Sequence, residues 1–157
     1  MQNDTPNPDR KIVEVSETVA INADAPKVWD MICKTCSLKE WHDDVDTCTP
    51  SKDDGQRART YVMKTAGDHP PVKMYEVELL RSPQIMTIAY VVDVQGLPVD
   101  HYHAQITVTP VGAGECTARI RSIFVDAEWG PPGLDPSKFV AAFYQRGLTK
   151  LKRLMEA

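Results

Sequence analysis

The sequence predicts an α+β fold in which a curved, seven-stranded antiparallel sheet wraps around one long C-terminal helix. Three observations lead to this prediction. Apolar residues alternate with polar ones over residues 11–21, six further strand-like runs follow between residues 45 and 126, and apolar residues recur at helical spacing after residue 135. Because a strongly curved sheet does not contact a single helix everywhere, we expect a cavity between the two layers.

The first part of the chain is predicted to form one strand and two short helices. Residues 11–21 carry valine and isoleucine on one side, which is the pattern of a half-buried strand. Asp24 is predicted to cap a helix that has Pro26 in its first turn. A second short helix is predicted from Ser37, which forms a capping-box pattern with Glu40.

The rest of the chain is predicted to form six strands and the long helix. Turn residues separate the six runs, which favours an antiparallel meander with strands at 45–50, 58–65, 72–81, 85–93, 99–109 and 115–126. Asp135 and Pro136 then open a helix of about 20 residues. Gly147 lies inside that helix, where glycine costs about 1 kcal/mol relative to alanine. We therefore expect Gly147 to mark a close approach to the sheet or to a ligand.

Composition and charge limit the functions that the chain can have. Its 157 residues carry a net charge of −4, with basic residues gathered only near the C-terminus, so nucleic acid is not an expected partner. No run approaches the ~18 apolar residues of a membrane span, so stable membrane insertion is not expected either. We expect a cytoplasmic monomer or homodimer, with a flexible tail at 1–10 and one domain at 11–157.

The cysteines do not predict a metal or redox site. Cys33 and Cys36 form a C-x-x-C pair with Cys48 close behind, but the pair closes a short helix and no second pair completes four ligands. In the cytosol such cysteines stay reduced, so we expect small, buried or half-buried thiols.

Two histidines on the strand at 99–109 raise the same question. His101 and His103 share one strand face, opposite the apolar face of Tyr102, and are therefore predicted to be exposed. A surface metal site and a role at the mouth of the cavity are the alternatives. No metal and no cofactor are expected.

Six short patterns, in order along residues 12–155, make the chain similar to a known superfamily. Among them are A-x-A-P-K-V-W at 23–29, L-K-E-W-H-x-x-V-x-x-C at 38–48, G-x-x-x-R-T at 55–60 and F-Y-x-x-G-L-x-x-L-K at 143–152. The chain resembles the START/Bet v 1-like (SRPBCC) superfamily, in particular its polyketide cyclase/dehydrase-like branch, and more distantly the plant abscisic-acid receptors. The resemblance implies a helix-grip fold around a ligand cavity, and it covers aromatic cyclases, lipid and hormone carriers, and receptors.

The resemblance also implies site residues. The position of His42 carries a cavity lysine in the abscisic-acid receptors, so His42 is predicted to act as an acid or base, with capping of the helix end as an equal alternative. Glu78 matches a family glutamate inside the cavity, with Arg59 as its partner. Strand alternation instead places Glu78 opposite Val77 and Leu79, toward solvent. Tyr102 occupies a cavity-lining position, with core packing as its alternative.

Two functions remain open on these residues. The first is a hydrophobic or aromatic small molecule bound in the cavity, with cyclase or dehydrase activity carried by His42, Glu78 and Tyr102. The second is a non-catalytic carrier or sensor of the same ligand. In both, the predicted ligand contacts are Trp41, Arg59, Tyr90, Phe124, Phe143 and Gly147. Many relatives carry tryptophan where this chain has Ile120, so we expect a wider cavity there.

Overall fold

The computed structural model describes residues 10–65, 71–129 and 134–157. Its elements follow the predicted order of one strand, two short helices, six strands and one long helix. They are β1 (Ile12–Ile21), α1 (Ala25–Ile32), α2 (Leu38–Trp41), β2 (Val45–Asp53), β3 (Gln56–Met63), β4 (Lys73–Ser82), β5 (Thr87–Gln95), β6 (Val99–Gly112), β7 (Glu115–Asp126) and α3 (Pro136–Glu156). The predicted fold class is confirmed.

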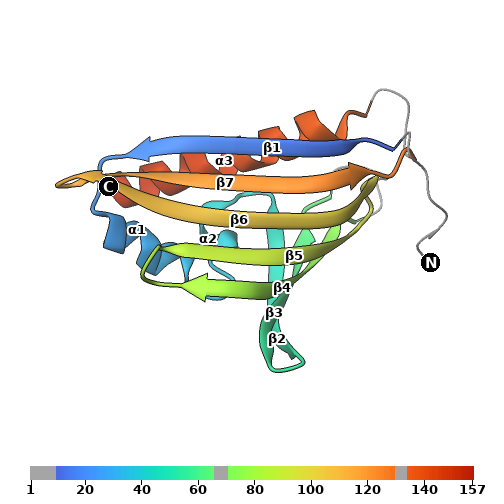
Figure 1. Cartoon of the computed structure of the whole chain (residues 1–157), viewed down its shortest axis with the longest axis horizontal. Coiled ribbons are helices and arrows are strands. Elements are labelled where there is room, and N and C mark those ends of the chain that lie inside the picture. The colour runs from blue at the N-terminus through green and yellow to red at the C-terminus, as the bar shows by residue number, and fades with distance from the viewer. Residues whose placement is uncertain (1–9, 66–70, 130–133) are drawn as a thin grey trace.

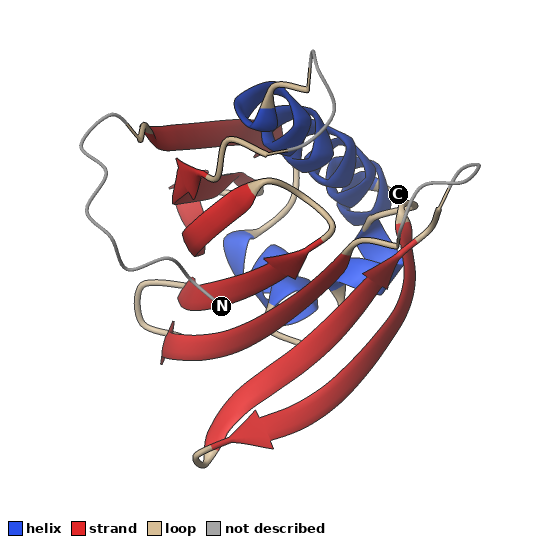
Figure 2. Cartoon of the chain, turned by 90° about the vertical axis from the view of Figure 1, so that its right-hand side faces the viewer, coloured by secondary structure: helices blue, strands red, loops and turns tan. Residues whose placement is uncertain are grey.

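The seven strands form one antiparallel sheet in the order β1-β7-β6-β5-β4-β3-β2. Six strands are therefore a meander, and β1 joins it by pairing with the last strand, with Val15 opposite Ser122. Figure 1 shows the long strands β1, β7 and β6 lying over α3, while the β2–β3 hairpin turns away at the other edge. Seen from the side, the sheet curls around the helices (Figure 2).

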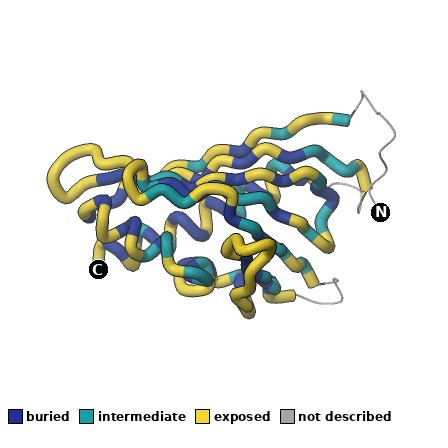
Figure 3. Tube along the Cα trace, turned by 60° about the horizontal axis from the view of Figure 1, so that its bottom comes forward, coloured by how far each residue is buried: buried dark blue, intermediate teal, exposed yellow. Residues whose placement is uncertain are grey.

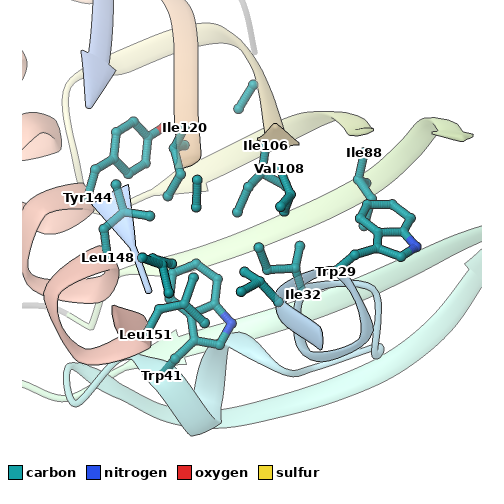
Figure 4. Packing of buried hydrophobic residues seen from close by; sticks show 14 of the residues in the cluster. Trp29, Ile32, Trp41, Ile88, Ile106, Val108, Ile120, Tyr144, Leu148 and Leu151 are labelled. Atoms are coloured by element: carbon teal, nitrogen blue, oxygen red, sulfur yellow. The ribbon is translucent and has the colours of Figure 1, made fainter. Parts of the chain in front are cut away.

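β6 and β7 bury alternate residues over most of their length, as the period of the sequence predicts. On β7, for example, Cys116, Ala118, Ile120 and Phe124 are buried, while Arg119 and Arg121 between them are exposed. Figure 3 shows buried and exposed positions alternating along the long strands, whereas in β2 only Val45 is buried. The buried residues of β6 and β7 meet α1 and the C-terminal half of α3 in a continuous hydrophobic cluster (Figure 4).

The long helix begins where the sequence predicts. The Asp135 carboxylate accepts a hydrogen bond from the backbone N–H of Ser137 at 3.0 Å, and Pro136 occupies the first turn. The apolar side of α3 then packs onto β1 and the concave side of the sheet.

Two predicted helix caps differ from the structure. The Ser37 hydroxyl caps nothing; it donates to the carbonyl oxygen of Ile32 at 3.2 Å and accepts from the indole N–H of Trp41 at 3.2 Å. Ser37 is buried, so its hydroxyl is used to join α1 and α2 from inside. Asp24 precedes α1, but its carboxylate accepts from the backbone N–H of Gly114 at 2.9 Å.

The expectation that the cysteines are reduced is wrong for two of them. Cys36 and Cys48 form a disulfide across a sequence separation of 12, with their Cα atoms 5.6 Å apart. Cys33 and Cys116 are free thiols, half-buried and buried respectively. The disulfide connects the turn between α1 and α2 to β2. The pair that matters is therefore Cys36 and Cys48, not the C-x-x-C pair Cys33 and Cys36.

The predicted tail lies outside the described residues except for Arg10. The Arg10 guanidinium forms an ion pair with Asp100 at 2.6 Å and donates to the carbonyl oxygen of Asp126 at 3.2 Å. This residue is therefore held against the sheet. No helix within the described part of the chain is long and apolar enough to cross a membrane.

Candidate functional site

A cavity of about 870 Å³ lies between the concave side of the sheet and the helices. Its walls come from α1, α2, the strands β3 to β7 and the N-terminal half of α3. Most of the lining side chains are apolar or aromatic, among them Leu38, Trp41, Met63, Met74, Ile88, Val92, Leu97, Ile106, Ile120, Val140 and Phe143. A cavity of this size and chemistry suits an apolar small molecule.

A buried charged pair interrupts the apolar wall on β3 and β4. Arg59 and Glu76 are register partners on these strands, and Arg59 Nε donates to Glu76 Oε1 at 2.9 Å. Both side chains line the cavity, although they are 9% and 7% exposed. Burial raises the pKa of the Glu76 carboxyl, against the opposing effect of Arg59. A hydrogen bond or a proton can therefore be exchanged at this point of an otherwise apolar wall.

Glu78 is close to this pair but outside the cavity. Its Oε1 accepts from Arg59 at 3.3 Å and from Arg81 at 2.6 Å, and its Oε2 accepts from Arg81 at 3.0 Å. Glu78 is 6% exposed, so the expectation that strand alternation sends it to solvent is wrong. Glu76 and Glu78 do share a face, but it is the inner one, where Arg59 and Arg81 compensate their charge.

Four tyrosines surround the cavity near the charged pair: Tyr61, Tyr90, Tyr102 and Tyr144. The Tyr61 and Tyr90 rings lie 5.9 and 5.6 Å from the guanidinium carbon of Arg59, within cation–π range. The Tyr102 and Tyr144 hydroxyls are hydrogen-bonded to each other. Burial raises the pKa of Tyr102 to about 12, so its hydroxyl keeps its proton at neutral pH.

His42 lines the cavity with both ring nitrogens already engaged. Its Nε2–H donates to the carbonyl oxygen of Phe143 at 2.8 Å, and its Nδ1 accepts from the backbone N–H of Asp44 at 3.1 Å. The ring also stacks on Phe143, with the centroids 3.9 Å apart. Burial lowers the pKa of His42, so the imidazole is neutral. This geometry favours the alternative role, a histidine that fixes the end of α2.

The structure brings most of the predicted contact residues together, with two exceptions. Trp41, Arg59, Tyr90, Tyr102 and Phe143 line the cavity. Phe124 does not line the cavity: it is fully buried and stacks behind Tyr102, at 5.4 Å between ring centroids.

Gly147 is the second exception. It does not line the cavity, and a Cβ atom placed on it would lie 2.8 Å from Cδ2 of His42 and 3.0 Å from the Trp41 ring. The close approach predicted for Gly147 is therefore to α2 and the residue after it, neither to the sheet nor to the cavity.

Sequence reasoning missed Glu76, Tyr61 and Tyr144 as lining residues. The strand period already placed Glu76 on the same face as Glu78, and that signal was available. Tyr144 follows Phe143 on the last helix; Phe143 was predicted as a ligand contact, but Tyr144 was predicted only as part of the apolar stripe of that helix. Ile120, where the resemblance led us to expect a wider cavity, does line the cavity.

The two strand histidines lie outside the cavity. His101 and His103 are exposed on β6, while Tyr102 between them is buried, as the alternation predicts. The His103 ring contacts the carbonyl oxygen of His101 at 3.0 Å. Within the described ranges, no group of three or more histidine, cysteine or acidic side chains is arranged to hold a metal ion.

A curved antiparallel sheet that encloses an apolar cavity against a C-terminal helix defines the helix-grip class of the START/Bet v 1 superfamily. Residues 13–156 match the family model described as polyketide cyclase/dehydrase and lipid transport, and the chain belongs to that family. A search among curated protein sequences found no match.

Solved structures of low sequence identity share the fold. An aromatase/cyclase from Streptomyces is 18% identical and covers 93% of this chain and 94% of its own, with a TM-score of 0.74. A START superfamily protein from Mycobacterium smegmatis is 16% identical over 91% of this chain and 97% of its own, with a TM-score of 0.69. Norcoclaurine synthase from Thalictrum flavum, in complex with dopamine and hydroxybenzaldehyde, is 14% identical over 98% and 95%, with a TM-score of 0.66.

Proposed function

We propose that the protein binds a hydrophobic, aromatic small molecule in the cavity between the sheet and α3. The observation that carries this proposal is the cavity itself: about 870 Å³ with apolar and aromatic walls and one buried ion pair, Arg59–Glu76, exposed to its interior. Apolar walls supply contact area, and a few polar groups orient a ligand. Membership of a family described by cyclisation, dehydration and lipid transport is consistent with this proposal.

A catalytic role is the second candidate, and Glu76 is the residue that favours it. A carboxylate beside a guanidinium can take a proton from a carbon next to a ketone while Arg59 stabilises the enolate oxygen by hydrogen bonding. If the substrate carries a β-hydroxyl, that group leaves as water with the proton held by Glu76, and Glu76 returns to its carboxylate form. Tyr102, which keeps its proton, is proposed to orient the substrate by donating a hydrogen bond, and Glu78 acts through Arg59.

The predicted roles of His42 and Glu78 can be restated from their contacts. We propose that His42 positions α2 against α3, since both of its nitrogens are engaged. We propose that Glu78 holds Arg59 in place rather than contacting the ligand. Trp41, Tyr90 and Phe143 are proposed wall residues.

Native mass spectrometry of freshly purified protein tests the binding proposal. We expect an additional mass from a co-purified apolar compound, released on denaturation and identified by fragmentation. Its removal followed by titration gives the affinity. A protein that carries no compound and binds none of a panel of polyketide-like aromatics contradicts the proposal.

One substitution then distinguishes a carrier from an enzyme. Glu76→Gln keeps the shape of the side chain but cannot accept a proton, so an enzyme loses turnover by about 100-fold or more while affinity changes far less. In a carrier the same change affects affinity alone. Glu115→Gln, on an exposed residue of β7, is the matched control.

A further inference from the structure

The charged groups in and beside the cavity wall on β3 and β4 form a cluster of four. Arg59, Glu76, Glu78 and Arg81 are linked in that cluster by contacts of 2.6–3.3 Å. Two guanidinium groups and two carboxylates carry no net charge. The cluster beside the cavity is therefore electrically neutral and has no excess positive charge.

Within this cluster, one acceptor is left open. Glu78 has both oxygens engaged, by Arg59 and Arg81, and does not line the cavity. Glu76 accepts at Oε1 only, and no described residue donates to its Oε2. Because Glu76 lines the cavity, a ligand can reach this carboxylate.

The guanidinium of Arg59 is poorly placed to attract an anion. Its charge is shared between two carboxylates at 2.9 and 3.3 Å, and the rings of Tyr61 and Tyr90 lie within cation–π range of it. A ligand carboxylate beside Arg59 would therefore meet the Glu76 carboxylate as well, in surroundings of low polarity where like charges repel strongly.

We propose that the ligand is an uncharged aromatic molecule that donates a hydrogen bond from a hydroxyl, phenol or enol group to Glu76, and that carboxylate ligands are disfavoured. This inference rests on the proposed function of the cavity. A hydroxyl can also accept from a free N–H of Arg59, so one group satisfies both members of the pair. The hydroxyls of Tyr90, Tyr102 and Tyr144 provide further partners of the same neutral kind.

Two other arrangements compete with this one. An ammonium group could pair with Glu76, but it would add a charge to a neutral cluster inside apolar walls. An anionic ligand could leave its carboxylate outside, near the exposed Lys64 at the edge of the cavity, where Arg146 is already paired with Asp44 at 2.6 Å.

Four fluorescent probes of one shape distinguish these cases: pyrene, 1-hydroxypyrene, 1-pyrenecarboxylate and 1-aminomethylpyrene, titrated at pH 7. We expect 1-hydroxypyrene to bind at least about tenfold more tightly than pyrene, the difference that a hydrogen bond to a charged group gives. We expect 1-pyrenecarboxylate to bind at least about tenfold more weakly than 1-hydroxypyrene.

Glu76→Gln should then change the order of the probes. Without the carboxylate, 1-hydroxypyrene should lose about tenfold in affinity while 1-pyrenecarboxylate gains, because Arg59 is left with less compensation. Glu115→Gln should bind all four probes as the wild type does. Circular dichroism and thermal melting of Glu76→Gln check that the variant is folded; if it is not, the wild-type order alone decides.

Each outcome bears on one proposal. A wild type that binds 1-pyrenecarboxylate as tightly as 1-hydroxypyrene overturns the inference, and loss of that binding in Lys64→Ala would assign it to the edge of the cavity. Tightest binding of 1-aminomethylpyrene overturns it in favour of a cationic ligand. If pyrene itself and all its derivatives fail to bind, it is the proposed function that fails.

Discussion

The two halves of α3 meet the same sheet in different ways. In the C-terminal half, Leu148, Leu151 and Met155 are buried in the continuous core with β1 and α1. In the N-terminal half, Val140, Phe143 and Tyr144 border the cavity. One regular helix thus supports a packed half and a hollow half of the molecule. The comparison teaches that apolar side chains of one helix can serve two purposes, because those of the packed half contact the core and those of the hollow half also face the cavity.

The buried ion pairs should give the largest effect, and they belong to the hollow half. Arg59→Met leaves Glu76 and Glu78 buried without their shared cation, which should cost about 3–5 kcal/mol of unfolding free energy at pH 7. Burial raises the pKa of the Glu76 carboxyl in the folded state, so this loss should shrink at acid pH, where Glu76 binds a proton. Urea denaturation at pH 7 and pH 5 measures it, with the exposed Arg119→Met as control. An equal loss at both pH values would contradict the explanation.

Leucine-to-alanine changes compare the two halves directly. Leu151 is fully buried, so Leu151→Ala should cost about 2–5 kcal/mol of unfolding free energy. Leu97 is half-buried and borders the cavity, so the same truncation there should cost less than about 1 kcal/mol while weakening ligand binding. Chemical denaturation and probe titration of both variants test this, and similar losses of stability would remove the distinction between the halves.

Gly147 lies at the boundary between the halves. Gly147→Ala should gain up to about 1 kcal/mol of helix propensity and still destabilise the protein by about 1–3 kcal/mol, since its methyl group would collide with the rings of His42 and Trp41. Gly147→Leu should be worse. Thermal melting checks both, with Gln145→Ala on the exposed side of α3 as the control. A more stable Gly147→Ala protein would show that the two rings move aside easily.

The smallest predicted effect is a pH dependence from His42. Burial holds the pKa of His42 below its usual 6.5 in the folded protein. As the pH falls below 6.5, His42 therefore binds a proton more readily in the unfolded chain than in the folded one. Stability from this group is therefore complete above pH 6.5 and is lost below it, by at most about 1.4 kcal/mol per pH unit. His42→Gln should flatten this part of the stability curve between pH 7.5 and 5.5. A variant that keeps the wild-type slope would assign the effect to other groups.

The order and type of the elements could be predicted from the sequence because local periods determine them. The strand period, the turn residues and the cap at Asp135 are all short-range signals, and the structure follows them. The errors are also physical. Ser37 has the sequence context of a cap, but tertiary contacts with Ile32 and Trp41 engage its hydroxyl instead.

The site was predicted less completely, since it depends on pairs that lie far apart in the chain. Arg59 and Glu76 become partners through strand register, across 17 positions. Hydropathy alone places the glutamates of β4 in solvent. Buried glutamates are stable only beside cations, and the sequence does not show that Arg59 and Arg81 lie next to them. The same reason applies to Cys36, whose partner is Cys48 rather than the closer Cys33.

The disulfide has a consequence for how a ligand reaches the cavity. Together with the backbone from residue 36 to 48, it closes a covalent ring that contains α2, and with it Leu38, Trp41 and His42 of the cavity wall. Because the disulfide joins the two ends of this short segment, we expect that α2 cannot move outward to open the cavity. Among the described lining residues, the exposed large apolar side chains are Trp129 and Phe139, beside the start of α3. If the cavity holds a ligand as proposed, the disulfide keeps one wall of the site in place, and we expect the ligand to enter on the side where α3 begins.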